Sequence, residues 1–370
     1  MKQSNGTTGS RGRSFRGTAG LVALSAAAIA LPPVLWSHEQ YHFVHLLCLI
    51  GIYIMLALGL NVIIGFTGIL NLGYAAFYGI GAYTAALLAV HAGLSFWVLL
   101  PVCGLTAAAA GIILGIPTLR LRGDYIAIVT LGFVEIVRIA LNNLDSITNG
   151  PKGLPGIGDS IKPPSLAAGT WSFSFNEDIY FYYLVLVFVC LSAGIMMRLH
   201  DSRAGRSWVA IREDETAAEA MGINTTAMKT QAFAVGTFFA GVAGCIYTHW
   251  IGFITPELFT FWESVLIVCM IVLGGNGSVK GVMLGAVLIV GIPELLRDLL
   301  LKVPADAAWG TAESWRGAMD NIVLARMLLF GLIMIVMVIF RPQGIIPALR
   351  TLTAAVSPDK TQGDRARGGK

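Results

Sequence analysis

The sequence predicts an all-α polytopic membrane protein of about ten transmembrane helices. Of its 370 residues, 56% are hydrophobic and only 12% are charged, whereas a soluble domain carries about 25% charged residues. The apolar residues gather in blocks of roughly 17–22 residues, the length that an α-helix needs to cross about 30 Å of hydrocarbon. The 43 glycines suit this fold class, because small residues let membrane helices approach one another closely.

Polar tails enclose the apolar blocks. Residues 1–18 are rich in Gly, Ser, Thr and Arg and are predicted to form a disordered tail. Residues 342–370 form a second polar and basic tail, so the membrane domain is expected to cover 19–341. The ten blocks that we predict to be transmembrane helices are 19–36, 43–64, 69–90, 96–116, 124–142, 179–198, 231–251, 258–274, 281–300 and 322–340.

The basic residues predict the orientation of the chain. With the N-terminus in the cytoplasm and ten crossings, most of the 25 Lys and Arg residues fall on the cytoplasmic side, as the positive-inside rule requires. Both termini are therefore expected in the cytoplasm, with loop 143–178 in the periplasm and loop 199–230 in the cytoplasm. The first block also resembles a signal peptide, because Ala28-Ile29-Ala30 follows a basic segment. Its cleavage would leave the other crossings unchanged.

Two Gly-rich segments interrupt the apolar pattern, at 65–68 (GFTG) and 274–277 (GGNG). They are candidates for corresponding points of two structural repeats. Broken backbone at membrane depth is tolerated where it lines a cavity or is buried in protein. The nearby polar side chains are therefore candidates for a translocation pathway, with helix packing as the alternative. These candidates, on 61–78 and on the predicted helix 124–142, are Asn61, Thr67, Asn71, Tyr74, Tyr78, Thr130 and Glu135.

Glu135 is a charged residue inside an apolar block. Ionisable groups at membrane depth are costly and often functional. Arg138 follows one helical turn later on the same face, so an internal ion pair is the favoured interpretation. Direct contact with a transported substrate is the less favoured one.

The loop 199–230 predicts a short helix that lies along the cytoplasmic face. Residues 208–221 are rich in Ala, Arg and Glu and lack Gly and Pro. Gly222 is placed to end this helix, and Asn224 or Thr225 is placed to cap the next one. Such a helix either seats its alanines and carboxylates on a partner protein or is a solvated connector. The candidate contact residues are Glu213, Glu215, Ala217, Ala218, Glu219, Ala220 and Gly222.

Several motifs together resemble the branched-chain amino-acid permease family of the LivM type. The segment 219–222 (EAMG) is similar to the coupling-loop motif of permeases of ATP-binding cassette (ABC) importers. The resemblance runs from about residue 43 to 347, and no motif is specific by itself. The other matching segments are GLN at 59–61, the Gly- and Tyr-containing stretch 65–83, LRLRGDYIAIVTLGFVEIVRI at 119–139, VLGGNGSVKG at 272–281 and FRPQGIIP at 340–347.

This resemblance implies a permease subunit that passes branched-chain amino acids across the bacterial inner membrane and hydrolyses no ATP itself. It also implies the partners: two ATP-binding cassette subunits, a second homologous permease in a heterodimer, and a periplasmic substrate-binding protein. The chain is also expected to contact the amino-acid substrate and membrane lipid. It is expected to bind no nucleic acid and no cofactor. The alternatives are a permease of the same family for urea or another small polar solute, and a secondary transporter with Glu135 as its proton site.

Signals for an enzyme or a metal site are weak. The segment 38–42 fits the zinc motif H-E-x-x-H, and His45 adds a third nitrogen. It lies in a predicted short outer loop, however, so an intramembrane metalloprotease is the less favoured alternative. A phosphate-binding loop needs G-x-x-x-x-G-K-[ST], and the only Gly-Lys step is at 369–370. The cysteines form no CxxC pair, and we predict all of them to be buried apolar residues: Cys48, Cys103, Cys190, Cys245 and Cys269.

Overall fold

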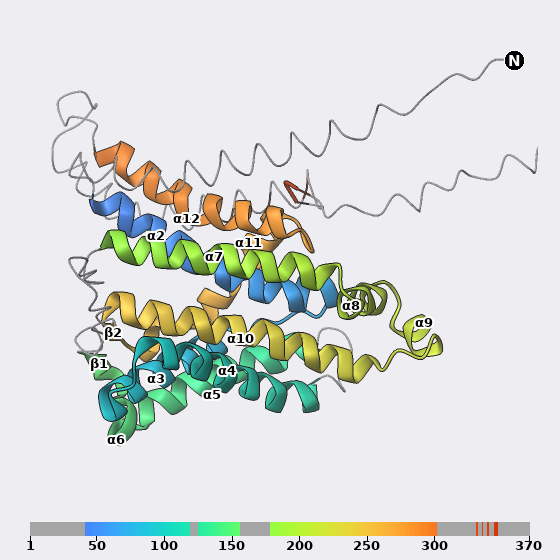
Figure 1. The fold of residues 1–370 in the computed structure, drawn as a ribbon, viewed down its shortest axis with the longest axis horizontal. Coiled ribbons are helices and arrows are strands. Elements are labelled where there is room, and N and C mark those ends of the chain that lie inside the picture. Colours follow the sequence, from blue (N-terminus) through green and yellow to red (C-terminus); the bar gives the residue numbers. More distant parts are fainter. Residues whose placement is uncertain are drawn as a thin grey trace, which may run out of the picture.

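The chain folds into a bundle of long helices that run side by side (Figure 1). The structure, a computed structural model, describes residues 41–118, 125–155, 178–301 and 344–346, and the single residues 331, 335 and 339. The elements in chain order are α2 (Tyr41–Asn61), the π-helical turn η1 (Val62–Phe66), α3 (Tyr74–Ala92), α4 (Phe96–Thr118), α5 (Tyr125–Asn143), α6 (Asp145–Thr148), η2 (Gly150–Lys152), β1 (Leu154–Pro155), α7 (Asp178–His200), α8 (Arg203–Glu213), α9 (Glu215–Ala220), α10 (Thr225–Ile251), β2 (Phe253–Ile254), η4 (Pro256–Leu258), α11 (Phe261–Gly274) and α12 (Val279–Leu301).

Within the described residues, seven helical segments are long and apolar enough to cross a membrane. They coincide with seven of the predicted blocks, those between 43 and 274. Helix α12 has 23 residues, and at about 1.5 Å per residue it is also long enough for a crossing. Its bounds enclose the predicted block 281–300. The blocks 19–36 and 322–340 lie outside the described residues, apart from three single positions, so the total of ten stays a prediction.

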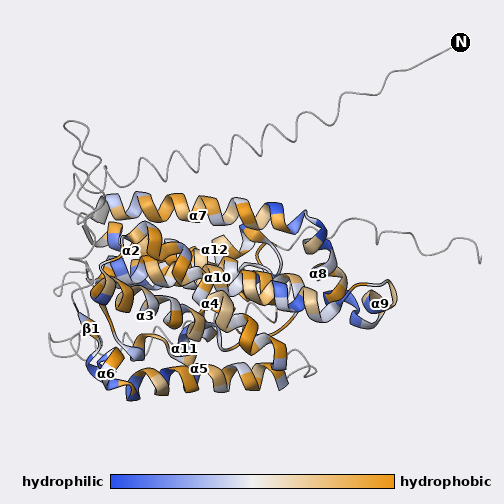
Figure 2. Cartoon of the chain, turned by 60° about the horizontal axis from the view of Figure 1, so that its bottom comes forward, coloured by the Kyte–Doolittle hydropathy of each residue, from blue (hydrophilic) through white to orange (hydrophobic). Residues whose placement is uncertain are grey.

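The hydropathy of the surface fits a protein that crosses a membrane. Figure 2 shows apolar helices along the middle of the bundle and polar residues at its two ends, around α6 and around α8 and α9. One end holds α6 and the two-stranded antiparallel pair β1–β2, in which Leu154 lies opposite Ile254. The other end holds α8 and α9, which project beyond the long helices (Figure 1).

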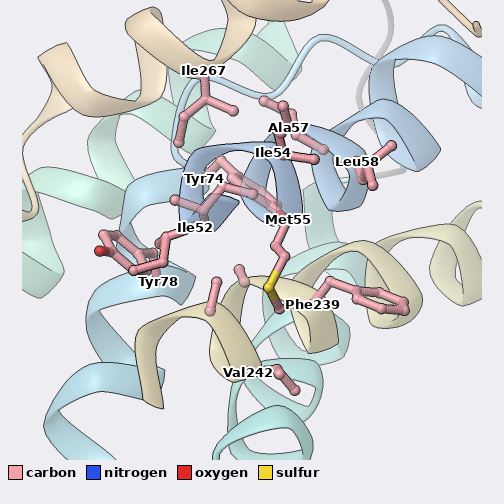
Figure 3. Close-up of a cluster of buried hydrophobic side chains, with 14 of the residues drawn as sticks. Ile52, Ile54, Met55, Ala57, Leu58, Tyr74, Tyr78, Phe239, Val242 and Ile267 are labelled. Carbon is pink, nitrogen blue, oxygen red and sulfur yellow. The ribbon is translucent and has the colours of Figure 1, made fainter. Parts of the chain in front are cut away.

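Helices α2 and α10 form the centre of the bundle. In the most apolar 18-residue stretch of each helix, 83% of the stretch is buried for α2 and 78% for α10. Helix α10 packs along α2, α3 and α4. Its glycines allow this, because a Cβ on Gly244 would lie only 2.5 Å from the Tyr78 carbonyl oxygen of α3. Figure 3 shows part of the resulting core, in which side chains of α2 such as Ile52 and Met55 lie among residues of α3, α10 and α11.

The structure corrects the predicted start of the third crossing. The block 69–90 was expected to be helical throughout, but α3 begins at Tyr74. Residues 68–73 are not helical, and Gly68 adopts a positive φ of 76°. The interruption therefore continues beyond the GFTG segment, which ends at residue 68. The non-helical stretch has a glycine at each end, Gly68 and Gly73.

The predicted single helix over 208–221 is also wrong. Asp214 is extended, with φ of −156° and ψ of 108°, and it divides the segment into α8 and α9. Its carboxylate accepts a hydrogen bond from Ala217 N at 3.0 Å, which is an N-cap for α9. The predicted end of the helix is confirmed, since Gly222 has a φ of 84°. So is the next cap, since Asn224 accepts from Ala227 N at 2.9 Å.

One of the cysteines departs from the prediction. Cys48, Cys103 and Cys245 are buried and Cys269 is partly buried, but Cys190 is exposed on α7. It lies beside Leu191, which is 54% exposed. Apolar character in the sequence cannot separate a side chain that faces the protein core from one that faces the surroundings of a membrane helix.

Candidate translocation and coupling sites

The two Gly-rich interruptions meet in space. Asn61, which is 1% exposed at the end of α2, accepts a hydrogen bond through Oδ1 from Gly277 N at 3.0 Å. Gly277 has a φ of 83° in the turn between α11 and α12. A Cβ on Gly65 would overlap Asn61 Oδ1 and would lie 2.7 Å from Gly277 N. We call these three residues the glycine junction. The structural repeats that the two interruptions suggested stay a prediction.

The segment 344–346 attaches to the same turn. Ile345 N donates to the Leu273 carbonyl and Ile346 N donates to the Gly274 carbonyl, each at 3.0 Å. Carbonyls at a helix end otherwise lack intrahelical partners. The segment 344–346 thus caps α11, a role that the sequence did not predict because the two segments lie far apart in the chain.

Polar side chains that the sequence analysis named as pathway candidates form hydrogen bonds with the backbone in and beside the non-helical segment 68–73. Thr130 Oγ1 of α5 accepts from Leu72 N at 3.1 Å, and Asn71 Oδ1 accepts from Gly73 N at 2.9 Å. Thr67 Oγ1 donates to a carbonyl one turn earlier at 2.5 Å. These contacts satisfy backbone groups that cannot reach water. Within the described residues, Asn71 Nδ2 is buried without a hydrogen-bond partner.

The two candidate tyrosines lie between helices. Tyr74 Oη donates to the Gly236 carbonyl of α10 at 2.8 Å, in a fully buried site. The Tyr78 ring packs edge-on against Phe259 and Tyr247, with centroid distances of 5.0 and 5.6 Å. Asn61, Thr67, Asn71, Tyr74, Tyr78 and Thr130 therefore gather inside the bundle around the start of α3.

Glu135 lies apart from them, on an outer side of α5. The predicted ion pair is confirmed, since Arg138 Nε donates to Glu135 Oε2 at 2.9 Å. Arg138 Nη1 also donates to Glu257 Oε1 at 3.0 Å, and Asn142 Nδ2 donates to the same oxygen at 3.4 Å. We call these four residues the ion cluster. The sequence did not predict that Glu257 joins this cluster, because Glu257 lies in the distant turn η4.

Helix α8 is fastened to the broken end of α2. Trp208 is fully buried, and its Nε1 donates to the Met228 carbonyl of α10 at 2.9 Å. Its ring stacks on Phe66 with a centroid distance of 6.4 Å and an interplanar angle of 13°. Arg212 Nη1 donates to the Gly65 carbonyl. Two side chains of α8 therefore hold the π-helical turn beside the glycine junction.

Helix α9 divides its residues between an inner and an outer side. Glu215 pairs with Lys229, Glu219 Oε1 accepts from Thr225 Oγ1 at 2.7 Å, and Ala218 is buried. The remaining candidates are exposed, together with Met221, which is 83% exposed. Sequence reasoning missed Met221, although an apolar residue at the end of a charged helix is a usable signal. Of the seven candidates, only Ala218 is buried; the exposed ones are Glu213, Glu215, Ala217, Glu219, Ala220 and Gly222.

The chain matches one family model over most of its length. Residues 42–338 match the family described as "Branched-chain amino acid transport system / permease component". The chain belongs to this family. It is 42% identical over 349 residues to the high-affinity branched-chain amino acid transport system permease protein LivM of Escherichia coli strain K12, covering 89% of this chain and 75% of the relative.

Two further relatives place the permease among related subunits. LivM of Salmonella typhimurium is 43% identical over 318 residues, which cover 81% of this chain and 68% of the relative. The permease protein LivH of Escherichia coli strain K12 is 28% identical over 264 residues, covering 68% of this chain and 83% of the relative. No solved structure matches the chain.

The residues of the zinc motif fall at the edge of what is described for this permease. His38 and Glu39 lie outside the described residues, and the His45 ring packs on Trp250 with a centroid distance of 4.2 Å. The part of the chain that the structure describes holds no group of three His, Cys, Asp or Glu residues that could bind a metal ion.

Substitution of Asn61 tests the glycine junction. Asn61→Leu removes the acceptor and leaves Gly277 N buried without a partner, at a cost of about 1–3 kcal/mol. We expect a lower melting temperature for the purified subunit in detergent, measured by intrinsic fluorescence. Asn143→Leu, at an exposed position of α5, is the matched control and should melt like the wild type. Equal melting of Asn61→Leu and wild type would show that the junction adds no stability.

Proposed function

We propose that this chain is the permease subunit of an ABC importer that carries branched-chain amino acids across the bacterial inner membrane. The family match over residues 42–338 and the 42% identity to LivM carry the proposal. Two partner subunits hydrolyse ATP, and this chain has no catalytic reaction and no cofactor of its own. It supplies a passage and a surface on which the partners act.

The second permease of the complex is a homologue of this chain. Escherichia coli strain K12 has two proteins in one branched-chain amino acid transport system, LivM and LivH, and both are similar to this chain. Two related permeases side by side form a natural pair around one passage. A periplasmic binding protein delivers the substrate to the pair and sets much of the selectivity.

The end of the bundle with α8 and α9 faces the cytoplasm in this proposal. Basic residues gather there, whereas the β1–β2 end carries few. This asymmetry follows the positive-inside rule. Both chain termini are then cytoplasmic, 199–230 is the coupling loop and 143–178 is periplasmic. The described basic residues near the α8–α9 end include Arg198, Arg203, Arg206, Arg212 and Lys229.

Helix α9 is the contact with an ATPase subunit. It offers the small Ala217 and Ala220 to an apolar groove, together with the exposed Met221 that follows the helix. Glu213, at the end of α8, is offered to basic residues at the rim. The inner contacts of Glu215 and Glu219 hold α9 against α10. A push on α9 therefore reaches α8 and, through the bond of Arg212 to the Gly65 carbonyl, the glycine junction.

The passage follows the broken segment 61–78 and helix α5. Its wall is mostly apolar with scattered amide and hydroxyl groups, which suits a small zwitterion with an aliphatic side chain. The unpartnered Asn71 Nδ2 supports this placement, because a buried donor without a protein partner is costly unless water or a ligand meets it. Weak binding is enough, since tight binding would trap the substrate.

Charge on the outer side of α9 tests the coupling contact. Met221→Asp adds a carboxylate at a position that is 83% exposed among the described residues, but that carboxylate is unpaired in an apolar groove of the ATPase. We expect uptake to fall about ten-fold or more, because an unpaired buried charge weakens binding by several kcal/mol. Membrane levels of the subunit should not change. Thr226→Asp adds the same charge at an exposed position of α10 and should transport normally.

Two companion variants act on the shape of α9. Gly222→Val opposes the positive φ at its end, and Glu219→Lys removes the acceptor for Thr225 Oγ1. Both should also lose uptake while the subunit stays in the membrane. Normal transport by Met221→Asp, Gly222→Val and Glu219→Lys would exclude α9 as the coupling element.

Competition in the reconstituted complex tests the substrate. Uptake of radiolabelled leucine into vesicles should be inhibited by excess isoleucine and valine, because they present the same zwitterion and a similar aliphatic group. Excess urea and ribose should have no effect. Inhibition by urea or ribose without inhibition by isoleucine or valine would assign the permease to the alternative small polar solutes.

A further inference from the structure

Helix α5 is the least buried of the candidate membrane spans. Only 22% of its most apolar window is buried, against 83% for α2. It lies at one edge of the bundle with apolar residues along its outside (Figure 2). Ile128 and Ile136 are 65% and 67% exposed. The residues of this outer face of α5 are Tyr125, Ile128, Gly132, Ile136 and Ile139.

The middle of the outer face has the shape of a helix-packing notch. A Cβ on Gly132 would have no heavy atom within 4 Å. Ile128 and Ile136 lie one turn before and after it, so two bulky side chains border an open position. Small residues between larger ones are the usual place where a second membrane helix approaches.

The ion cluster places charge beside the outer face of α5, from the middle of the helix toward its Asn143 end. Glu135 lies near the middle of α5, roughly 12 Å from the Asn143 end at about 1.5 Å per residue. The side chains of Glu135, Arg138 and Glu257 are 37%, 26% and 63% exposed. Two carboxylates and one guanidinium leave a net negative charge beside the outer face. Exposed charge at this depth is costly in hydrocarbon and marks contact with protein or with a water-filled passage.

Helix α7 gives the contrast. Its outward side chains are also exposed, with Val187 at 64% and Leu191 at 54%. Gly194 has open space around it as well. Its charged residues lie only at its ends, with Asp178 at the start and Arg198 in the last turn. An apolar helix side with charges only at its ends is what lipid contact requires.

We propose that the outer face of α5 is the interface with the second permease, and that the ion cluster lies beside this interface. This inference rests on the proposed function in one respect, which is that a second permease exists. The Gly132 notch receives a helix of that partner. The charges of Glu135, Arg138 and Glu257 then meet water and polar groups of the partner instead of lipid.

Photo-crosslinking in intact membranes tests the interface. A benzophenone amino acid in place of Ile128 or Ile136 should crosslink to the tagged second permease under ultraviolet light. The same amino acid in place of Val187 or Leu191 should give no crosslink to it. Crosslinks only from α7, or crosslinks from α5 to a second copy of this chain, would overturn the proposal. So would an absence of any crosslink from α5, which would mean that lipid covers it.

Co-purification of the second permease is a second test, which does not depend on a bulky benzophenone that could itself disrupt packing. Gly132→Leu fills the notch and should lower the amount of second permease that co-purifies with this chain several-fold. Gly194→Leu, on the open side of α7, should leave it unchanged. Equal co-purification with both variants would overturn the interface. A wild-type complex that contains the second permease and imports leucine keeps the proposed function, whatever the result at α5.

Discussion

The hydrogen bond from Gly277 N to Asn61 Oδ1 is the contact on which the rest of the structure depends. It joins the end of α2, the most buried span, to the turn that reverses the chain between α11 and α12. An amide side chain serves here because it accepts from a backbone donor without bringing a charge into the bundle. A Cβ on Gly65 would overlap the amide, and Gly277 has a positive φ of 83° that favours glycine.

Several other elements are positioned from this junction. The turn at 274–277 presents the carbonyls of Leu273 and Gly274 to the segment 344–346, which brings a distant part of the chain to the same place. On the other side, the break after α2 directs residues 68–73 against Thr130 before α3 begins. Irregular backbone is thus buried in protein, as a membrane requires. Any motion of α8 acts directly on this region, through Arg212 and Trp208.

The sequence predicted the features that depend on local pattern. Apolar length predicted seven spans that the structure has, the glycine at 222 predicted a helix end, and the spacing of Glu135 and Arg138 predicted an ion pair. Each of these needs only residues of one continuous stretch of chain. The family was also predictable, because its motifs are spread over most of the chain.

The features that sequence reasoning missed depend on contacts between distant segments. Glu257 joins the ion cluster from a turn more than a hundred residues after Arg138. The break at Asp214 depends on contacts that hold the helices on either side of it. Trp208 of α8 donates to the Met228 carbonyl, and Lys229 of α10 pairs with Glu215 of α9. Exposure of Cys190 depends on which side of α7 meets the bundle. Apolar periodicity is weak in a membrane helix, where both the core and the lipid prefer apolar residues.

The most direct test of the account is whether the bond from Arg212 to the Gly65 carbonyl carries the work of ATP hydrolysis into the membrane. Arg212→Met keeps the aliphatic stem that packs on Gly68 but removes the donor. In vesicles with the complete complex, leucine imported per ATP hydrolysed should fall about ten-fold, as expected for the loss of a charged hydrogen bond of about 1.5–3 kcal/mol. ATP hydrolysis itself should continue. An unchanged ratio of leucine to ATP would contradict the account.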